Sequence, residues 1–313
     1  MIVLENLTKH FGQLTAVDSI SLNVDRKQVL GFLGPNGAGK STTMKMISGF
    51  LEPSSGTAFV AGYDILESPV EVKSKIGYLP EGAPTYGDMT PLSFLDFVAE
   101  IRGFRGRERG RKIAQVTERV RLEDVMFQPI ETLSKGFKRR VGLAQAMIHD
   151  PDVLILDEPT DGLDPNQKHH VRKLINEMAQ EKAIIVSTHI LEEVEAVCTD
   201  AVIISGGKLL KSGTPEELLE HDSNHNSIVV LAKNSDIVQV RESLDILGSV
   251  IETETGADEK IFTSLRITLK DKNHGLKQVN SLIREKDLNV EEVYLAKGAL
   301  DKVFRNITTK EKY

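Results

Sequence analysis

The chain is poor in the residues on which several kinds of protein depend. Its 313 residues include one cysteine and no tryptophan, and only 5% are aromatic. One cysteine excludes an internal disulfide framework and a zinc site made of several thiolates from one chain. Because Cys198 lies within "EEVEAVCTDAVIIS", we expect a small core residue and not a nucleophile.

Long apolar runs and an excess of positive charge are also missing. No uninterrupted apolar run approaches the roughly 20 residues that span a bilayer, and "MIVLENLTKHF" lacks the regions of a signal peptide. We therefore expect a soluble, cytoplasmic chain. The net charge of −7 argues against broad nucleic-acid binding, which needs a basic footprint. The length suits one large domain and a smaller one.

The first two-thirds alternate short apolar strands with helical stretches. "KQVLGFLG", "DVLILDE" and "AIIVSTH" predict buried strands, and "STTMKMISGF" has helical spacing. Between about residues 91 and 148 the pattern predicts helices without a strand. This part is expected to be an α/β domain over 1–220 that carries a helical insertion. The basic stretch "RGFRGRERGRK" within it is interpreted as a solvated edge, with contact to anionic lipid or a membrane partner as the alternative.

A polar stretch, "EHDSNHNS", marks a domain boundary. We place a linker at 221–227 and a second domain at 228–313. The second domain reads as strand, helix, two strands, helix and strand, which is the order of the α+β ferredoxin-like arrangement. It shows no constellation of catalytic groups, and a docking or dimer-stabilising role is the hypothesis for it.

A phosphate-binding loop is indicated by "GPNGAGKST", which fits G-x-x-x-x-G-K-[ST] between a strand and a helix. In such a loop backbone N–H groups converge on phosphate oxygens at a helix N-terminus. Lys40 is expected to reach the outer phosphates, and Ser41 to hold Mg²⁺. The alternative is a glycine turn with a solvated lysine. The predicted nucleotide-binding residues here are Gly34, Pro35, Asn36, Gly37, Ala38, Gly39, Lys40, Ser41 and Thr42.

Carboxylates follow a second buried strand in "VLILDEPTDGLDP". Asp157 is predicted to bind Mg²⁺, and Glu158 to polarise the water that attacks the terminal phosphate. A strand that runs into a solvated acidic turn is the alternative. His189 follows the next strand, where an imidazole can bond a γ-phosphate; a structural histidine is the alternative. The other seven histidines are expected at the surface.

A basic turn, "LSKGFKRR", has no glycine loop beside it in sequence. Together with the motifs above, this turn makes about residues 1–220 similar to the ATP-binding subunit of ABC transporters. The turn corresponds to that family's signature "LSGGQ", with Lys135 in place of a small residue. The resemblance implies that two such domains pair head to tail. Ser134 and Gly136 of one chain then contact the ATP that the P-loop of the other holds.

Further matches follow from this resemblance. Phe11 stands where the family stacks an aromatic ring on adenine, although it can equally be a core residue. "DGLD", which ends at Asp164, matches the loop that joins the two ATP sites, and His189 matches the switch histidine. Glu81 stands where most members carry the Q-loop glutamine, and a role near Mg²⁺ is carried over to it.

The resemblance implies a P-loop NTPase cassette that binds ATP and Mg²⁺ and hydrolyses ATP. Its partners are a separately encoded membrane permease, of exporter type, and a second nucleotide-binding subunit, with no nucleic acid. The location implied is peripheral, on the inner face of the cell membrane. Two rivals stay open: a non-transport cassette ATPase acting on ribosomes or DNA, and a nucleotide-gated scaffold whose site Glu81 marks as inactive.

Overall fold

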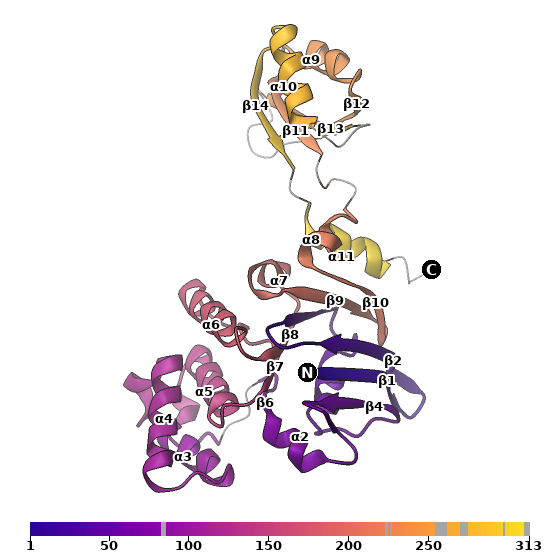
Figure 1. Cartoon of the computed structure of the whole chain (residues 1–313). Coiled ribbons are helices and arrows are strands. Elements are labelled where there is room, and N and C mark those ends of the chain that lie inside the picture. The colour runs from indigo at the N-terminus through magenta and orange to yellow at the C-terminus, as the bar shows by residue number, and fades with distance from the viewer. Residues whose placement is uncertain are drawn as a thin grey trace. The chain divides into compact units, whose positions relative to one another are not determined.

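The computed structural model describes residues 1–82, 86–222, 225, 227–253, 262–269, 275–296 and 298–309. The chain divides into two compact units, Met1–Pro215 and Glu216–Tyr313 (Figure 1). Residues 223, 224 and 226 of the predicted linker and residues 254, 260, 261 and 270 at predicted strand ends lie outside the described residues.

The first unit is built on a six-stranded sheet with the order β10-β9-β3-β8-β7-β6. All neighbouring pairs are parallel except β9 with β10. The strands are β3 (Val29–Leu33), β6 (Ile76–Leu79), β7 (Val153–Asp157), β8 (Ala183–Thr188), β9 (Asp200–Ser205) and β10 (Lys208–Gly213). Side chains alternate between two cores: Val153 and Ile155 face one, and Leu154 and Leu156 the other. Both faces are covered, so these strands read as continuous apolar runs.

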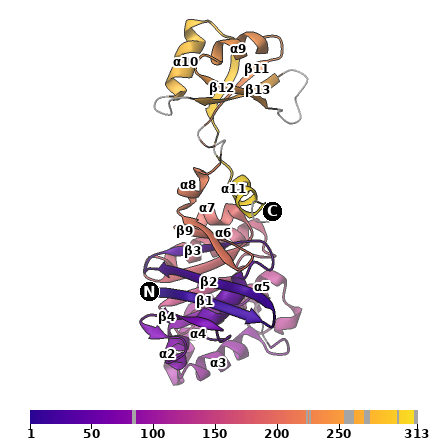
Figure 2. The same ribbon diagram turned by 90° about the vertical axis from the view of Figure 1, so that its right-hand side faces the viewer.

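A second, antiparallel sheet covers one face. Its order is β2-β1-β4-β5, with β1 (Ile2–Phe11), β2 (Leu14–Val24), β4 (Ser55–Val60) and β5 (Tyr63–Asp64). Figure 2 shows β1, β2 and β4 side by side. Helix α1 (Lys40–Ile47) contributes Met44, Met46 and Ile47 to a core shared by residues of both sheets. The helix that follows the phosphate loop is thereby anchored on its buried face.

The other face is covered by helices. The predicted insertion holds α3 (Pro91–Ile101), α4 (Gly106–Val120) and α5 (Lys135–Met147), with the 3-10 turns η1 (Glu123–Val125) and η2 (Ile130–Thr132). Thr90 and Ser93 form a capping box at the start of α3. The remaining helices of this unit are α2 (Pro69–Lys75), α6 (Pro165–Met178) and α7 (Leu191–Val197). The predicted fold class of the first unit, an α/β cassette with a helical insertion, is confirmed.

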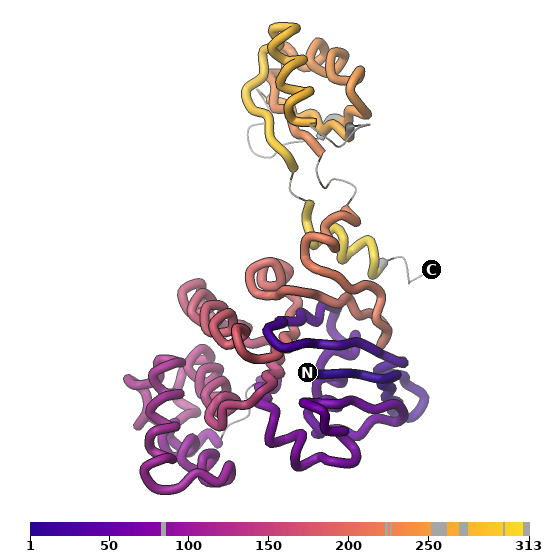
Figure 3. The backbone as a smooth tube through the Cα atoms, viewed as in Figure 1, coloured from indigo at the N-terminus to yellow at the C-terminus, as the bar shows by residue number. Residues whose placement is uncertain are grey.

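The second unit begins with α8 (Pro215–Leu219), most of which belongs to it, and ends with α11 (Leu300–Thr309). Between them lie β11 (Ile228–Lys233), α9 (Ile237–Leu244), β12 (Gly248–Thr253), β13 (Phe262–Leu269), α10 (Gly275–Glu285) and β14 (Val290–Leu295). The sheet is antiparallel with the order β12-β13-β11-β14. Figure 3 traces this βαββαβ path, the element order of a ferredoxin-like unit.

His149, His170 and His225 are half-buried, whereas a surface position was predicted for each. His149 follows α5, is half-buried, and has its Nε2 3.0 Å from the carbonyl oxygen of Ile76. Burial, reinforced by the positive charge of Arg102, lowers the pKa of His149 to about 4. The side chain is therefore neutral in the folded protein at neutral pH.

We expect His149 to make the folded state sensitive to acid. Because its pKa is depressed on folding, the unfolded chain binds more protons between about pH 4 and 6.5, and stability is lost as the pH falls through that window. The loss should approach about 2–3 kcal/mol at the acid end. In His149→Gln, urea unfolding between pH 7 and pH 4 should show a shallower decline than the wild type. Parallel stability curves would contradict this.

Candidate functional site

The glycine loop connects β3 to α1 and is held by backbone geometry that requires glycine. Gly39 is the N-cap of α1 with φ +105°, and a Cβ on it would lie 2.5 Å from the carbonyl oxygen of Ala16. A side chain is excluded there both by this contact and by the left-handed conformation. The first turn of α1 therefore points its free N–H groups into the loop, as an anion site requires.

Lys40 is the first residue of α1 and is only 6% exposed. Its Nζ donates to the carbonyl oxygens of Gly34 at 2.6 Å and of Pro35 at 3.1 Å. Burial lowers the pKa of the Lys40 ammonium. The opposing contributions come from three carboxylates, in the order Glu158, Asp157 and Glu81. A phosphate group would meet a partly desolvated cation here.

The loop forms one wall of a pocket that also gathers residues distant in sequence. The pocket is lined by Ala16, Asn36, Gly37, Ala38, Gly39, Lys40, Ser41, Thr42, Glu81, Glu158 and His189. Parallel strands explain the meeting, because β7 and β8 are neighbours and end at the same edge. Six of the predicted nucleotide-binding residues are not among the lining residues: Phe11, Gly34, Pro35, Ser134, Gly136 and Asp164.

Asp157, the last residue of β7, is buried with 1% exposure. One carboxylate oxygen accepts a hydrogen bond from the hydroxyl of Ser187 on β8, while Oδ2 is buried without a hydrogen-bond partner. A buried carboxylate oxygen without a donor is costly. This oxygen is suited to bind Mg²⁺ directly or to accept a hydrogen bond from a water bound to Mg²⁺.

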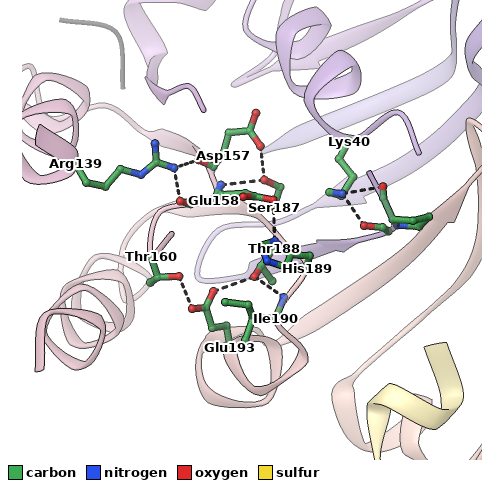
Figure 4. Close-up of polar contacts among 12 residues, drawn as sticks. Lys40, Arg139, Asp157, Glu158, Thr160, Ser187, Thr188, His189, Ile190 and Glu193 are labelled. Carbon is green, nitrogen blue, oxygen red and sulfur yellow. Dashed lines mark hydrogen bonds and ion pairs between the residues drawn. The ribbon is translucent and has the colours of Figure 1, made fainter. Parts of the chain in front are cut away.

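Glu158 follows directly and has an unusual backbone. Its φ is +50°, a conformation that costs a residue with a Cβ about 1–2 kcal/mol. Its N–H donates to the hydroxyl of Ser187 at 3.0 Å. Its carboxylate Oε1 lies 3.0 Å from Nδ1 of His189, whose side chain is 51% exposed against 17% for Glu158 (Figure 4). The two groups predicted to act on the γ-phosphate and its water therefore touch each other.

Glu81 lies shortly after β6 in the pocket wall, and its side chain is exposed. Its charge acts on Lys40 in the same direction as the charges of Asp157 and Glu158. The pocket is therefore more negative than it would be with a glutamine at this position.

The residues of the predicted signature occupy a different surface. Ser134 is exposed, and its hydroxyl caps α5 by accepting a hydrogen bond from the N–H of Phe137. Gly136 is packed so closely that a Cβ would lie 2.3 Å from Oε1 of Gln167 on α6. Asp164 caps α6 through the N–H of Gln167 at 2.9 Å. Phe11 is 47% exposed at the end of β1, with Nζ of Lys9 5.4 Å from its ring centre.

Sequence analysis missed a buried hydrogen-bond network near the carboxyl ends of β7 and β8. Glu193, on α7 and 4% exposed, accepts hydrogen bonds from the hydroxyls of Thr160 and, at 2.9 Å, Thr188. It ties the segment after Glu158 to the end of β8. Ser187 was missed as well, although a polar residue inside the apolar run "AIIVST" is a usable signal.

Magnesium fits this site as an ion shared with phosphate. Among the residues that the structure describes, no group of three or more His, Cys, Asp or Glu side chains is arranged to hold a metal ion. Mg²⁺ commonly takes only one or two protein carboxylates and completes its shell with phosphate oxygens and water. Asp157, with its unpartnered oxygen, and the hydroxyl of Ser41 in the pocket wall are donors of this kind.

The fold and the loop define a P-loop nucleotide-binding domain. Comparison with known proteins extends this: the family model described as "ABC transporter" matches residues 17–161. The linearmycin resistance ATP-binding protein LnrL of Bacillus subtilis (strain 168) is 32% identical over 314 residues, covering 98% of both chains. A solved structure titled as the ATP binding subunit of an ABC transporter has 30% identity and a TM-score of 0.65 over 70% of this chain and 92% of the other.

The chain therefore belongs to the family of ABC transporter ATP-binding proteins, whose members are ATPases that bind ATP. A probable multidrug ABC transporter ATP-binding protein, YbhF of Escherichia coli (strain K12), is 39% identical over 221 residues. That match covers 70% of this chain but only 38% of YbhF. Within the described part of the chain, no helix has both the length and the apolar character to cross a membrane.

Proposed function

We propose that this chain binds and hydrolyses MgATP as one of a pair of nucleotide-binding subunits and thereby powers a separately encoded membrane permease of exporter type. The observation that carries the proposal is the division of the predicted site. The P-loop, Glu158 and His189 line one pocket, whereas Ser134 and Gly136 do not. A second chain that brings its own Ser134 and Gly136 would complete the site.

The roles follow from the geometry. Lys40 and the N-terminus of α1 hold the phosphates, and Glu158 removes the proton of the attacking water. The contact with His189 keeps that carboxylate oriented toward the pocket. Ser41, Asp157 and Glu81 would hold Mg²⁺, which would neutralise charge on the phosphates. Phe11 stacks on the adenine, and Asp164 belongs to the loop between the two sites.

The exporter class is supported by the names of the relatives. The location on the cytoplasmic face of the membrane is proposed because an ATP-binding subunit of a transporter works with a membrane permease. Two of the relatives carry names that refer to drug efflux or resistance, multidrug for YbhF and linearmycin resistance for LnrL. The second of these matches along nearly the whole chain, including the second unit. The transported substrate is therefore expected to be a molecule that leaves the cell.

The proposal is tested by phosphate release at increasing chain concentration. Because each site needs a second chain, the specific activity with MgATP should rise with concentration toward a plateau, and EDTA should abolish it. Light scattering on the same samples should show dimers with ATP and monomers with ADP. A constant specific activity from a monomer would contradict the paired site.

Glu81 gives a prediction that separates an active site from an inactive one. In Glu81→Gln the charge near Asp157 and Glu158 is removed, so less Mg²⁺ is bound at a given concentration while turnover at saturating Mg²⁺ remains. We expect the Mg²⁺ concentration for half-maximal ATPase to rise by about 3- to 10-fold, the effect of roughly 1 kcal/mol of electrostatic attraction. An active Glu81→Gln variant beside an inactive wild type would instead support the nucleotide-gated scaffold.

A further inference from the structure

A buried arginine connects three parts of the site that are separate in sequence. Arg139, on the second turn of α5, is 6% exposed. Its Nη1 donates to the carbonyl oxygen of Pro80 at 3.1 Å, and its Nη2 donates to the carbonyl oxygens of both Asp157 and Glu158. Figure 4 shows the guanidinium reaching the chain at Asp157 and Glu158 from the side opposite Lys40.

The convergence of two successive carbonyls depends on the backbone of Glu158. Along an extended strand neighbouring carbonyls point to opposite sides, so one donor cannot serve both. At Glu158 the φ of +50° turns the chain out of the strand conformation, and the carbonyls of Asp157 and Glu158 then face the same guanidinium. The N–H of Glu158 is held on β8 by Ser187 at 3.0 Å. The N–H of Glu158 is thus held by Ser187, and its carbonyl oxygen by Arg139.

Charge favours the same arrangement. The acidic groups that act on Arg139 are Asp157, Asp161, Glu158 and Glu81. Charge-assisted hydrogen bonds of this kind are stronger than neutral ones, and the planar fork of arginine can serve several acceptors at once. A lysine has the charge without the fork, which makes it a matched probe of geometry.

We infer that Arg139 is a positioning residue, which holds the backbone of Glu158 in its left-handed conformation and links it to Pro80 and to α5. The inference rests on the proposed function, because it assigns to Arg139 an effect that passes through the general base. Pro80 precedes Glu81, and Ser134 is the N-cap of α5, so the same guanidinium couples the signature helix to the Mg²⁺ side of the pocket. Movement of α5 on pairing would reach Glu158 through this contact.

The test compares Arg139→Lys and Arg139→Gln with the wild-type full chain. Both variants should keep the affinity for a fluorescent ATP analogue, because Lys40 and the loop are untouched. The kcat for ATP should fall by about 10- to 100-fold, the effect expected when a catalytic group is displaced by a fraction of an ångström to one ångström. Arg172→Gln is the control: this half-buried arginine pairs with Glu192 at 3.1 Å on α7 and does not line the pocket. Its kcat should not change.

A double-mutant cycle separates positioning from a general structural role. In a Glu158→Gln background, where no general base remains, adding Arg139→Lys should cause no further loss in single-turnover hydrolysis. A further loss as large as in the wild-type background would overturn the inference, as would full activity of Arg139→Lys and Arg139→Gln. Loss of nucleotide binding in both variants would also overturn it, because Arg139 would then support the whole domain. An inactive wild type would instead count against the proposed function.

Discussion

Replacing Glu158 by glutamine should lower steady-state ATP hydrolysis by about 10²–10⁴-fold, the usual contribution of a general base. The amide keeps the shape of the side chain and can still contact Nδ1 of His189, which lies 3.0 Å from the carboxylate in the wild type. It cannot accept the proton of the attacking water. ATP binding should therefore survive while turnover is lost, and ATP-bound dimers should accumulate in light scattering.

Glu192→Gln is the control for this experiment. Glu192 is an exposed carboxylate on α7 that pairs with Arg172 and does not line the pocket. Its removal should leave the ATPase rate unchanged, because exposed ion pairs of this kind contribute little. Near-wild-type hydrolysis by Glu158→Gln would show that another group activates the water, and the assignment of the base would be wrong.

Replacing Lys40 by alanine should weaken ATP binding about 10- to 100-fold, the effect of losing one hydrogen bond to a charged group. The buried ammonium is held at the pocket by the carbonyl oxygens of Gly34 and Pro35. Lys40 is the one cationic residue of the loop "GPNGAGKST". Equilibrium titration with a fluorescent ATP analogue measures the change directly, and the effect should be larger for ATP than for AMP because the outer phosphates are the ones contacted.

Lys45→Ala serves as the comparison, since Lys45 is on the same helix but outside the pocket lining. Its affinity for ATP should match the wild type. If Lys40→Ala bound ATP as tightly as Lys45→Ala, the loop would hold nucleotide through its backbone alone, and the phosphate contact assigned to Lys40 would have to be withdrawn.

Sequence analysis could predict the parts of the site that are contiguous in sequence or that directly follow a recognisable strand. The glycine loop is contiguous, so its motif and its flanking strand and helix are readable as one pattern. Glu158 and His189 each follow a buried strand and were each assigned to the γ-phosphate; the structure brings them together because β7 and β8 are parallel neighbours that end at one edge of the sheet. The fold class followed from the same alternation of strands and helices.

The remainder depends on packing that no local pattern records. Arg139 appears in sequence as one member of the basic run "KRR", and only the docking of α5 on β6 and β7 makes it a buried donor to three carbonyls. His149 was predicted at the surface, because nothing near it in sequence shows that Ile76 will lie within 3.0 Å. Both residues are polar groups whose burial is decided by distant segments.

The central claim, that this ATPase serves a membrane permease, is tested most directly by purifying the full chain from detergent-solubilised membranes and assaying ATPase on the material that accompanies it. The account predicts a multi-spanning protein in stable ratio with the chain, and an Mg²⁺-dependent ATPase rate above that of the chain alone. The Glu158→Gln variant should bring down the same membrane protein with no such activity. Recovery of ribosomal or DNA-bound partners in place of a membrane protein would contradict the account.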